Sequence, residues 1–208
     1  MRGEASILSR RQLFLLAGAT ARLGASEQTD FWNRKPAEEW NPSDIYRLAN
    51  HSPWANPVQS WPQPPGRIAA STIGGSTWGG SPEWGPLGVV TWESARPIRD
   101  AFKAPLPDVF DDYYVIGVDG IPRAARNLNY LRQFTVLRGR GKQRWSAQAA
   151  VAQELVRNSE ICAFGFHRDA APIDPDTSEV VFETQFGRWL VQAKFRPRDM
   201  LYHGELAL

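Results

Sequence analysis

Residues 180–195 read VVFETQFGRWLVQAKF, and this stretch decides the fold. Apolar and polar side chains alternate on both sides of Gly187 and Arg188, as two strands of a half-buried antiparallel sheet require. Glycine stands at the first central position of the turn, where a type II′ hairpin needs it. The register that follows pairs four sets of residues on one apolar face: Phe186 with Trp189, Thr184 with Val191, Phe182 with Ala193, and Val180 with Phe195.

The other face of the same hairpin pairs Glu183 with Gln192 and Glu179 with Arg196. These polar pairs predict a solvent-exposed face. A slip of one residue would mix the two faces, so the pattern specifies the register well.

Shorter patterns predict the other elements of the chain. Helices are expected after the caps Asn41 and Ser94 and over residues 122–134. Strands are expected at residues 89–93, 113–118, 135–137, 149–155 and 161–166. Residues 149–155 are also compatible with a helix, and the strand-helix-strand order before residue 118 permits a parallel pair. The sequence predicts an α+β fold, a mainly antiparallel sheet with helices covering one face.

The N-terminal part of the chain divides into three segments. Residues 1–25 contain Ser9-Arg10-Arg11 before a short apolar run, which is typical of a twin-arginine export signal. An aromatic-rich arm with a short helix follows over 26–61, and a Gly/Pro/Ser-rich loop or linker over 62–88. The α+β domain is expected over 89–208. The signal predicts a periplasmic or extracellular location. The alternative is a cytoplasmic N-terminal helix that happens to contain Arg-Arg, which would have the same sequence pattern.

Composition excludes several classes of protein. No apolar stretch approaches the ~20 residues of a transmembrane helix, and the single cysteine, Cys162, cannot form an internal disulfide. The chain carries a net charge of +2, but residues 1–25 hold four arginines and one glutamate, so the remainder carries −1. A chain so close to neutrality gives no argument for nucleic acid as a partner.

Four sequence blocks resemble a family of hypothetical exported bacterial proteins. They are Phe31-Trp32-Asn33-Arg34-Lys35-Pro36 (FW-x-x-K-P), Ser52-Pro53-Trp54-Ala55 (SPWA), Trp92-Glu93-Ser94-Ala95-Arg96-Pro97, and the segment from Lys194 to Tyr202 (K-F-x-x-x-D-M). The family has no assigned activity. The resemblance therefore implies one domain in an envelope setting and transfers no site residue.

Motifs that would carry catalysis or a cofactor are weak in this sequence. Gly139-Arg140-Gly141-Lys142 lacks the first glycine of a P-loop, and the chain has no zinc-protease or nucleophile-elbow motif. His167 beside Asp169 offers a general base only if a pocket adjoins it. We predict no cofactor and no metal, and we expect a non-catalytic role.

Three further features each have a structural explanation. Asp174-Pro175-Asp176-Thr177-Ser178-Glu179 offers oxygen ligands to a cation, but it is also good turn chemistry. Asp111-Asp112 fits a paired-carboxylate site or a solvated loop, and Cys162 fits a small core residue. The tryptophans permit a glycan-binding module, but they also fill cores.

Seven cations and no acid lie between Arg123 and Arg144. The densest part predicts an anionic-ligand site at Arg138, Arg140, Lys142 and Arg144, for lipid headgroups or acidic polysaccharide. The alternative is a solvated face paired with the nearby acids Asp108, Asp111, Asp112 and Asp119. The function that follows is a non-catalytic envelope protein that binds or scaffolds an envelope component or protein. A hydrolase acting on an envelope substrate is the alternative.

Overall fold

A computed structural model describes residues 30–59, 61–62, 87–103, 105–121, 127–154, 160–186 and 189–208. The predicted export signal, most of the 62–88 loop, Arg123, Arg126 and the Gly187-Arg188 turn lie outside the described residues.

Two five-stranded antiparallel sheets form the frame of the molecule. The first contains, in spatial order, β1 (Ala55–Gln59), β3 (Leu87–Trp92), β4 (Tyr113–Val118), β8 (Glu160–His167) and β7 (Ala149–Glu154). The second contains β2 (Trp61–Pro62), β10 (Trp189–Phe195), β9 (Val180–Phe186), β5 (Val136–Arg138) and β6 (Arg144–Ser146). A two-stranded hairpin, β11 (Leu201–Tyr202) with β12 (Glu205–Leu206), stands apart from both.

The two sheets join at both edges through consecutive stretches of chain. β1 ends at Gln59 and β2 begins at Trp61, so one stretch pairs first with β3 and then with β10. β6 ends at Ser146 and β7 begins at Ala149, so a second stretch pairs first with β5 and then with β8. The strands of the two five-stranded sheets therefore form a closed ring, which protects the edges of both sheets.

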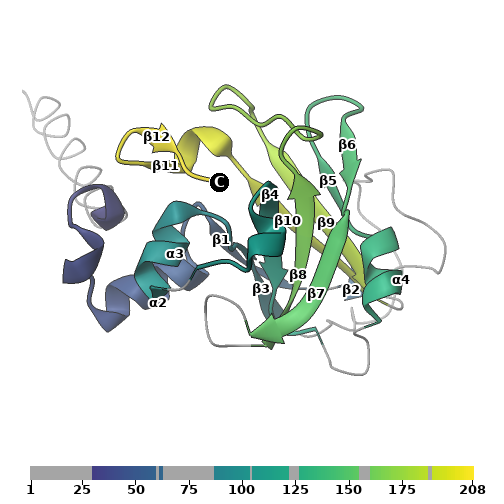
Figure 1. The fold of residues 1–208 in the computed structure, drawn as a ribbon, viewed down its shortest axis with the longest axis horizontal. Helices are drawn as coiled ribbons and strands as arrows, with labels where there is room; N and C mark the ends of the chain where they lie inside the picture. The colour runs from purple at the N-terminus through teal and green to yellow at the C-terminus, as the bar shows by residue number, and fades with distance from the viewer. Residues whose placement is uncertain are drawn as a thin grey trace, which may run out of the picture.

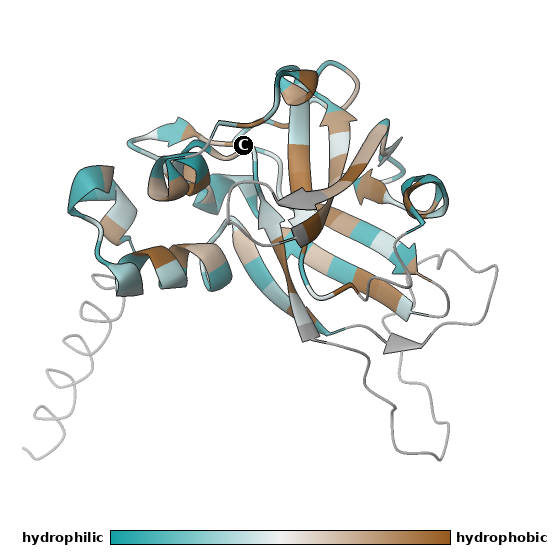
Figure 2. Ribbon diagram, turned by 60° about the horizontal axis from the view of Figure 1, so that its bottom comes forward, coloured by the Kyte–Doolittle hydropathy of each residue, from teal (hydrophilic) through white to brown (hydrophobic). Residues whose placement is uncertain are grey.

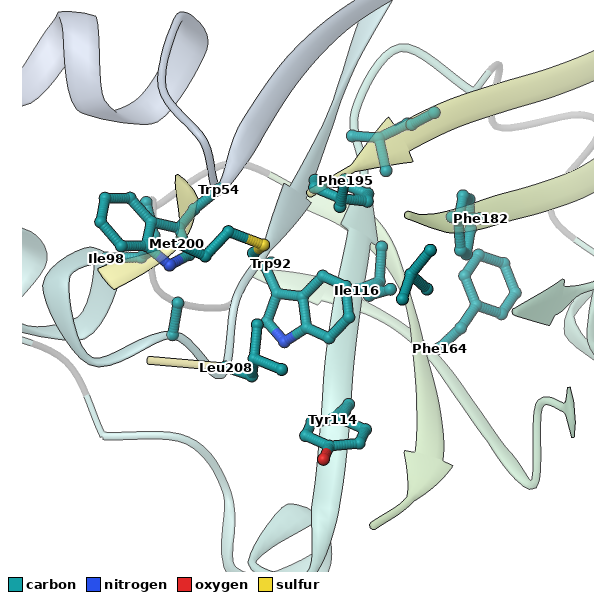
Figure 3. Close-up of a cluster of buried hydrophobic side chains, with 14 of the residues drawn as sticks. Trp54, Trp92, Ile98, Tyr114, Ile116, Phe164, Phe182, Phe195, Met200 and Leu208 are labelled. Carbon is teal, nitrogen blue, oxygen red and sulfur yellow. The ribbon is translucent and has the colours of Figure 1, made fainter. Parts of the chain in front are cut away.

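Alternating side chains fill the space between the sheets. Phe164 of β8 and Phe182 of β9 lie 5.9 Å apart between ring centroids, and both are fully buried. Figure 3 shows them beside Ile116 of β4, and the core continues to Trp92 and Trp54. Figure 2 shows the matching alternation of hydrophobic and hydrophilic residues along the strands.

Helices cover the ends of this frame. α2 (Pro42–Asn50) packs against α3 (Arg96–Phe102), β1 and β3, whereas α4 (Leu128–Gln133) packs against β7 and β9. Figure 1 places α2, α3 and the β11–β12 hairpin on one side of the sheets and α4 on the other. Short 3₁₀ helices lie at Phe31–Asn33 (η1), Ala37–Glu39 (η2), Asp108–Phe110 (η3) and Pro197–Asp199 (η5). The α+β class and the antiparallel pairing are confirmed.

The structure decides one open alternative in this region and corrects one prediction. β3 pairs with β4 in the antiparallel sense, because α3 packs beside α2 and η2 and does not lead to a parallel strand. Ser94 does not cap α3, whose N-cap is Ala95 without a side-chain bond. Instead, the Ser94 hydroxyl accepts a hydrogen bond from the Val115 amide at 3.0 Å and extends the β3–β4 pairing.

The N-terminal arm belongs to the same core as the sheets. Phe31, Trp32 and Trp40 are at most 6% exposed, and the Trp54 indole donates to the Ala207 carbonyl at 2.7 Å. The arm is thereby tied to the C-terminal segment, more than 150 positions away in the chain.

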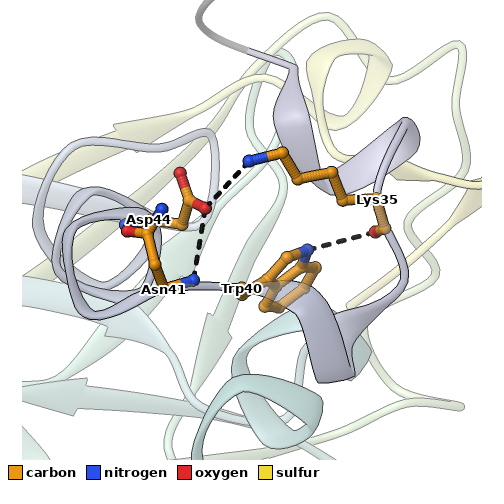
Figure 4. Close-up of polar contacts among 4 residues, drawn as sticks. All are labelled: Lys35, Trp40, Asn41 and Asp44. Atoms are coloured by element: carbon orange, nitrogen blue, oxygen red, sulfur yellow. Dashed lines mark hydrogen bonds and ion pairs between the residues drawn. The ribbon is translucent and has the colours of Figure 1, made fainter.

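Asn41 caps α2 as predicted, in a full capping box with Asp44. The Asp44 amide donates to Asn41 Oδ1 at 3.0 Å, and Asp44 Oδ2 accepts from the Asn41 amide at 3.3 Å. Lys35 forms an ion pair with the same carboxylate at 3.3 Å, and its carbonyl accepts from the Trp40 indole (Figure 4). These contacts fix the arm where it enters the helix.

The C-terminal hairpin confirms the predicted register at all four apolar pairs. Its polar face is exposed at Lys194 and Arg196, as the pattern indicates, but it is buried at Glu183 and Gln185. Glu183 is 2% exposed and Gln185 is 3% exposed. Glu179 forms its ion pair with Lys194, at 3.5 Å.

Candidate functional site

The predicted basic site lies on the hairpin formed by β5 and β6. Leu137 pairs with Trp145 and faces the core, so Arg138 and Arg144, which also pair, face outward. Gly139 allows the close approach of the Trp145 ring, because a Cβ there would lie 2.7 Å from that ring. Gly141 has a φ of +69°, which glycine adopts without strain, at the turn. Residue type therefore fixes the shape of the tip.

Arg138 differs from the other three predicted residues because it has an acidic partner. Its Nη2 lies 2.8 Å from Glu183 Oε2, and the two side chains are 23% and 3% exposed. Gln192 donates to the same carboxylate oxygen. This cation is thus part of the outer face of β9 and β10, and its charge is neutralised.

Arg140, Lys142 and Arg144 are exposed at or beside the tip of the hairpin. In the described part of the chain, no ion pair joins any of them to an acidic side chain, including Asp108, Asp111, Asp112 and Asp119. Arg144 also stands directly opposite Arg138, and like charges in that position repel. Glu183 relieves this repulsion, and three positive charges remain uncompensated.

His167, which the sequence offers as a general base, lies apart from the basic hairpin. His167 ends β8, where its Nδ1 lies 3.9 Å from the exposed Asp169 carboxylate and its ring lies against Tyr113. It lines neither of the two cavities described below.

The remaining sequence candidates occupy structural positions. Thr177 bonds back to Asp174 through both its hydroxyl and its amide, which closes a turn. Among the described residues, no group of three or more His, Cys, Asp or Glu side chains could hold a metal ion. Asp111 and Asp112 are exposed, and Cys162 is fully buried in the core.

The tryptophans whose side chains the structure describes are not exposed platforms. Trp32, Trp40, Trp54 and Trp92 are buried, and Trp145 and Trp189 are half-buried. Trp78 and Trp84 lie outside the described residues. Tyr46, with 62% of its surface exposed, is the most exposed described aromatic side chain.

Two cavities open on the side of the molecule that carries α2 and α3. One, of about 500 Å³, lies between Tyr46 and the adjoining ends of β1 and β3. The other, of about 740 Å³, lies between η2, α3 and the β11–β12 turn. Its lining includes Arg96, Arg99, Lys103, Tyr202 and His203.

Sequence reasoning missed this second set of residues. The spacing of Arg96, Arg99 and Lys103 along one predicted helix was a usable signal, since positions i, i+3 and i+7 share a face. Nothing in the sequence indicated that Tyr202 and His203 would lie opposite them.

Comparison of the chain with family models, with curated proteins and with solved structures found no match. In the described part of the chain, no helix has the length and apolar character needed to cross a membrane.

Proposed function

We propose that this chain is a non-catalytic protein of the cell envelope, exported by its twin-arginine segment, that attaches to anionic lipid headgroups through the β5–β6 hairpin. One observation carries the proposal. Arg140, Lys142 and Arg144 are exposed on one hairpin, and none of them has an ion-pair partner among the described residues.

The shape of the hairpin favours a surface over a polymer chain. The three cations occupy a turn and a strand end at the periphery of the sheets (Figure 1), not the lining of either cavity described above. A projecting hairpin can bring all three cations against a flat charged layer at the same time. Each cation near an anionic surface contributes about 1 kcal/mol, so three would strengthen binding by roughly 100-fold.

Co-sedimentation with vesicles tests the proposal. The full chain should sediment with vesicles that contain phosphatidylglycerol and not with phosphatidylcholine vesicles. The bound fraction should fall as salt rises, because the Debye length shrinks from ~10 Å at 0.1 M to ~3 Å at 1 M. Replacement of Arg140, Lys142 and Arg144 by serine should abolish most of the binding.

The matched control removes three other exposed cations, Lys194, Arg196 and Arg198, of which Lys194 and Arg198 already have acidic partners. This variant loses the same net charge and should sediment like the wild type. Arg138 is left intact in both variants, since its loss would disturb the Glu183 contact. Equal losses in both variants, or none in the hairpin variant, would refute the assignment. Binding to acidic polysaccharide but not to vesicles would replace lipid with polysaccharide as the partner.

A further inference from the structure

A second basic surface lies far along the chain from the hairpin, in the cavity of about 740 Å³ beside α3. This volume falls within the ~300–1,000 Å³ range of ligand pockets. One wall is α3, the second is η2 with Pro36, and the third is the β11–β12 turn. Figure 1 shows these three elements gathered at the same side of the sheets.

The α3 wall carries a stripe of cations. Arg96 and Arg99 lie on the helix, Lys103 is its C-cap, and all three are exposed. Arg96 is partly engaged, 3.7 Å from the Asp100 carboxylate and above the Tyr202 ring. Arg99 and Lys103 form no ion pair with a described residue, so they are available to a ligand.

The opposite wall is held in a fixed conformation. His203 has a φ of +52°, its ring lies 4.2 Å from that of Tyr202, and its amide donates to Asn33 Oδ1 at 2.7 Å. Lys103, across the cavity, has a φ of +51°. In the described part of the chain these two are the non-glycine residues with positive φ, and both line this cavity. Lys103 adopts this conformation as the C-cap of α3, where it is common, whereas at His203 it is unusual for a residue other than glycine.

Tyr202 provides a neutral floor beneath the histidine. Its side chain is buried, and burial raises the pKa of the phenol to about 12, with the Asp100 carboxylate adding to the effect by charge and by a hydrogen bond. The phenol therefore stays protonated at physiological pH. The phenol donates a hydrogen bond to the Asp100 carboxylate, which also lines the cavity and is partly engaged by Arg96.

The lining demands a ligand with both negative groups and hydrogen-bond donors. Arg99 on α3 and Lys103 at its C-cap can each contact an anionic group of the ligand. Glu38 on the η2 wall is an exposed acceptor with no ion-pair partner among the described residues. A polyphosphate offers no donor to this carboxylate and would be repelled by it, whereas a saccharide hydroxyl can donate to it.

We propose that the groove between α3, η2 and the β11–β12 turn binds an acidic oligosaccharide. Its carboxylates contact Arg99 and Lys103, its hydroxyl groups donate to Glu38, and a sugar ring lies against the exposed His203 imidazole. This site is independent of the hairpin and of its proposed attachment to lipid.

Calorimetric titration with trigalacturonate tests the proposal, and maltotriose and tripolyphosphate serve as the neutral and the phosphate probes. Trigalacturonate should bind, and the other two should bind at least tenfold more weakly. Replacement of Arg99 and Lys103 by serine should weaken trigalacturonate about 100-fold, at about tenfold for each charge-assisted hydrogen bond lost. The matched variant, with serine at Arg196 and Arg198, should bind like the wild type.

His203→Asn tests the stacking wall without breaking the turn. Asparagine tolerates the same backbone conformation, so the fold should be retained while the imidazole is lost. Trigalacturonate affinity should fall severalfold with an unchanged urea midpoint. Preferential binding of tripolyphosphate, an unchanged affinity in the Arg99/Lys103 variant, or no binding of trigalacturonate would each overturn the proposal.

Discussion

Replacement of Glu183 by alanine should destabilise the fold by about 2 kcal/mol. The Glu183 side chain is 3% exposed, and its Oε2 accepts from both Arg138 and Gln192. Hydrogen bonds to a charged group contribute about 1.5–3 kcal/mol. Two features hold the loss near the lower end of this range. Arg138 remains 23% exposed, so water can partly replace the lost carboxylate. Glu183 Oε1 is buried without a hydrogen-bond partner in the described structure, so its removal relieves a desolvation cost.

Urea denaturation, followed by tryptophan fluorescence, measures this loss. With a slope of about 2 kcal/mol per molar urea, the midpoint should fall by about 1 M. The alternation of residues 180–195 alone predicts a change within ~0.5 kcal/mol, because it places Glu183 on a solvent-exposed face. The two expectations are far enough apart for one experiment to decide between them.

A double-mutant cycle isolates the contact from the simple loss of buried atoms. Arg138→Ala, Glu183→Ala and the double variant should show a coupling energy of about 1 kcal/mol or more. Additive losses would mean that the 2.8 Å contact contributes nothing to the free energy of unfolding. Arg138 would then be as available to a ligand as the cations at the tip of the hairpin. The hairpin site would then contain four available charges and not three.

Three further predictions concern other parts of the chain. Phe182→Ala should cost about 3–5 kcal/mol in the same urea assay, because the ring is fully buried. Val181→Ala should cost less than half as much, because the Val181 side chain points to the opposite face and is only half-buried. In a spectroscopic titration at 295 nm, Tyr202 should ionise near pH 12, because burial raises its pKa, and Tyr202→Phe should remove that step. Its contribution to stability is complete below pH 10 and is lost as the pH rises towards 12, because the unfolded phenol ionises first. Lysine at Arg10 and Arg11 should leave an uncleaved precursor in the cytoplasm, and recovery of the wild-type chain there with Met1 intact would contradict export.

The sequence predicted what depends on neighbours in the chain. The register of residues 180–195 follows from alternation, the Asn41 cap from local bonding, and the strand at residues 113–118 from a short apolar run. It did not predict the division into two sheets, because the stretches at residues 55–62 and 144–154 change partners on the way. Each change is decided by strands distant in sequence, which local periodicity does not encode.

The same distinction separates the two basic surfaces. A dense run of cations singled out Arg138 together with the hairpin tip, yet a carboxylate 45 positions away neutralises that arginine. Arg99 and Lys103 belong to a stretch of ordinary composition, and they form a site only because the β11–β12 turn folds against α3. The density of cations along the chain therefore overestimates the available charge of the hairpin and overlooks the α3 surface.

A candidate binding surface is distinguished by a set of cations that the fold leaves exposed and uncompensated. In a chain whose total charge is only +2, such sets require acids gathered elsewhere, as at the exposed Asp108, Asp111 and Asp112 around η3. If the hairpin attaches to lipid as proposed, its uncompensated cations should steer it towards an anionic layer before any specific contact forms.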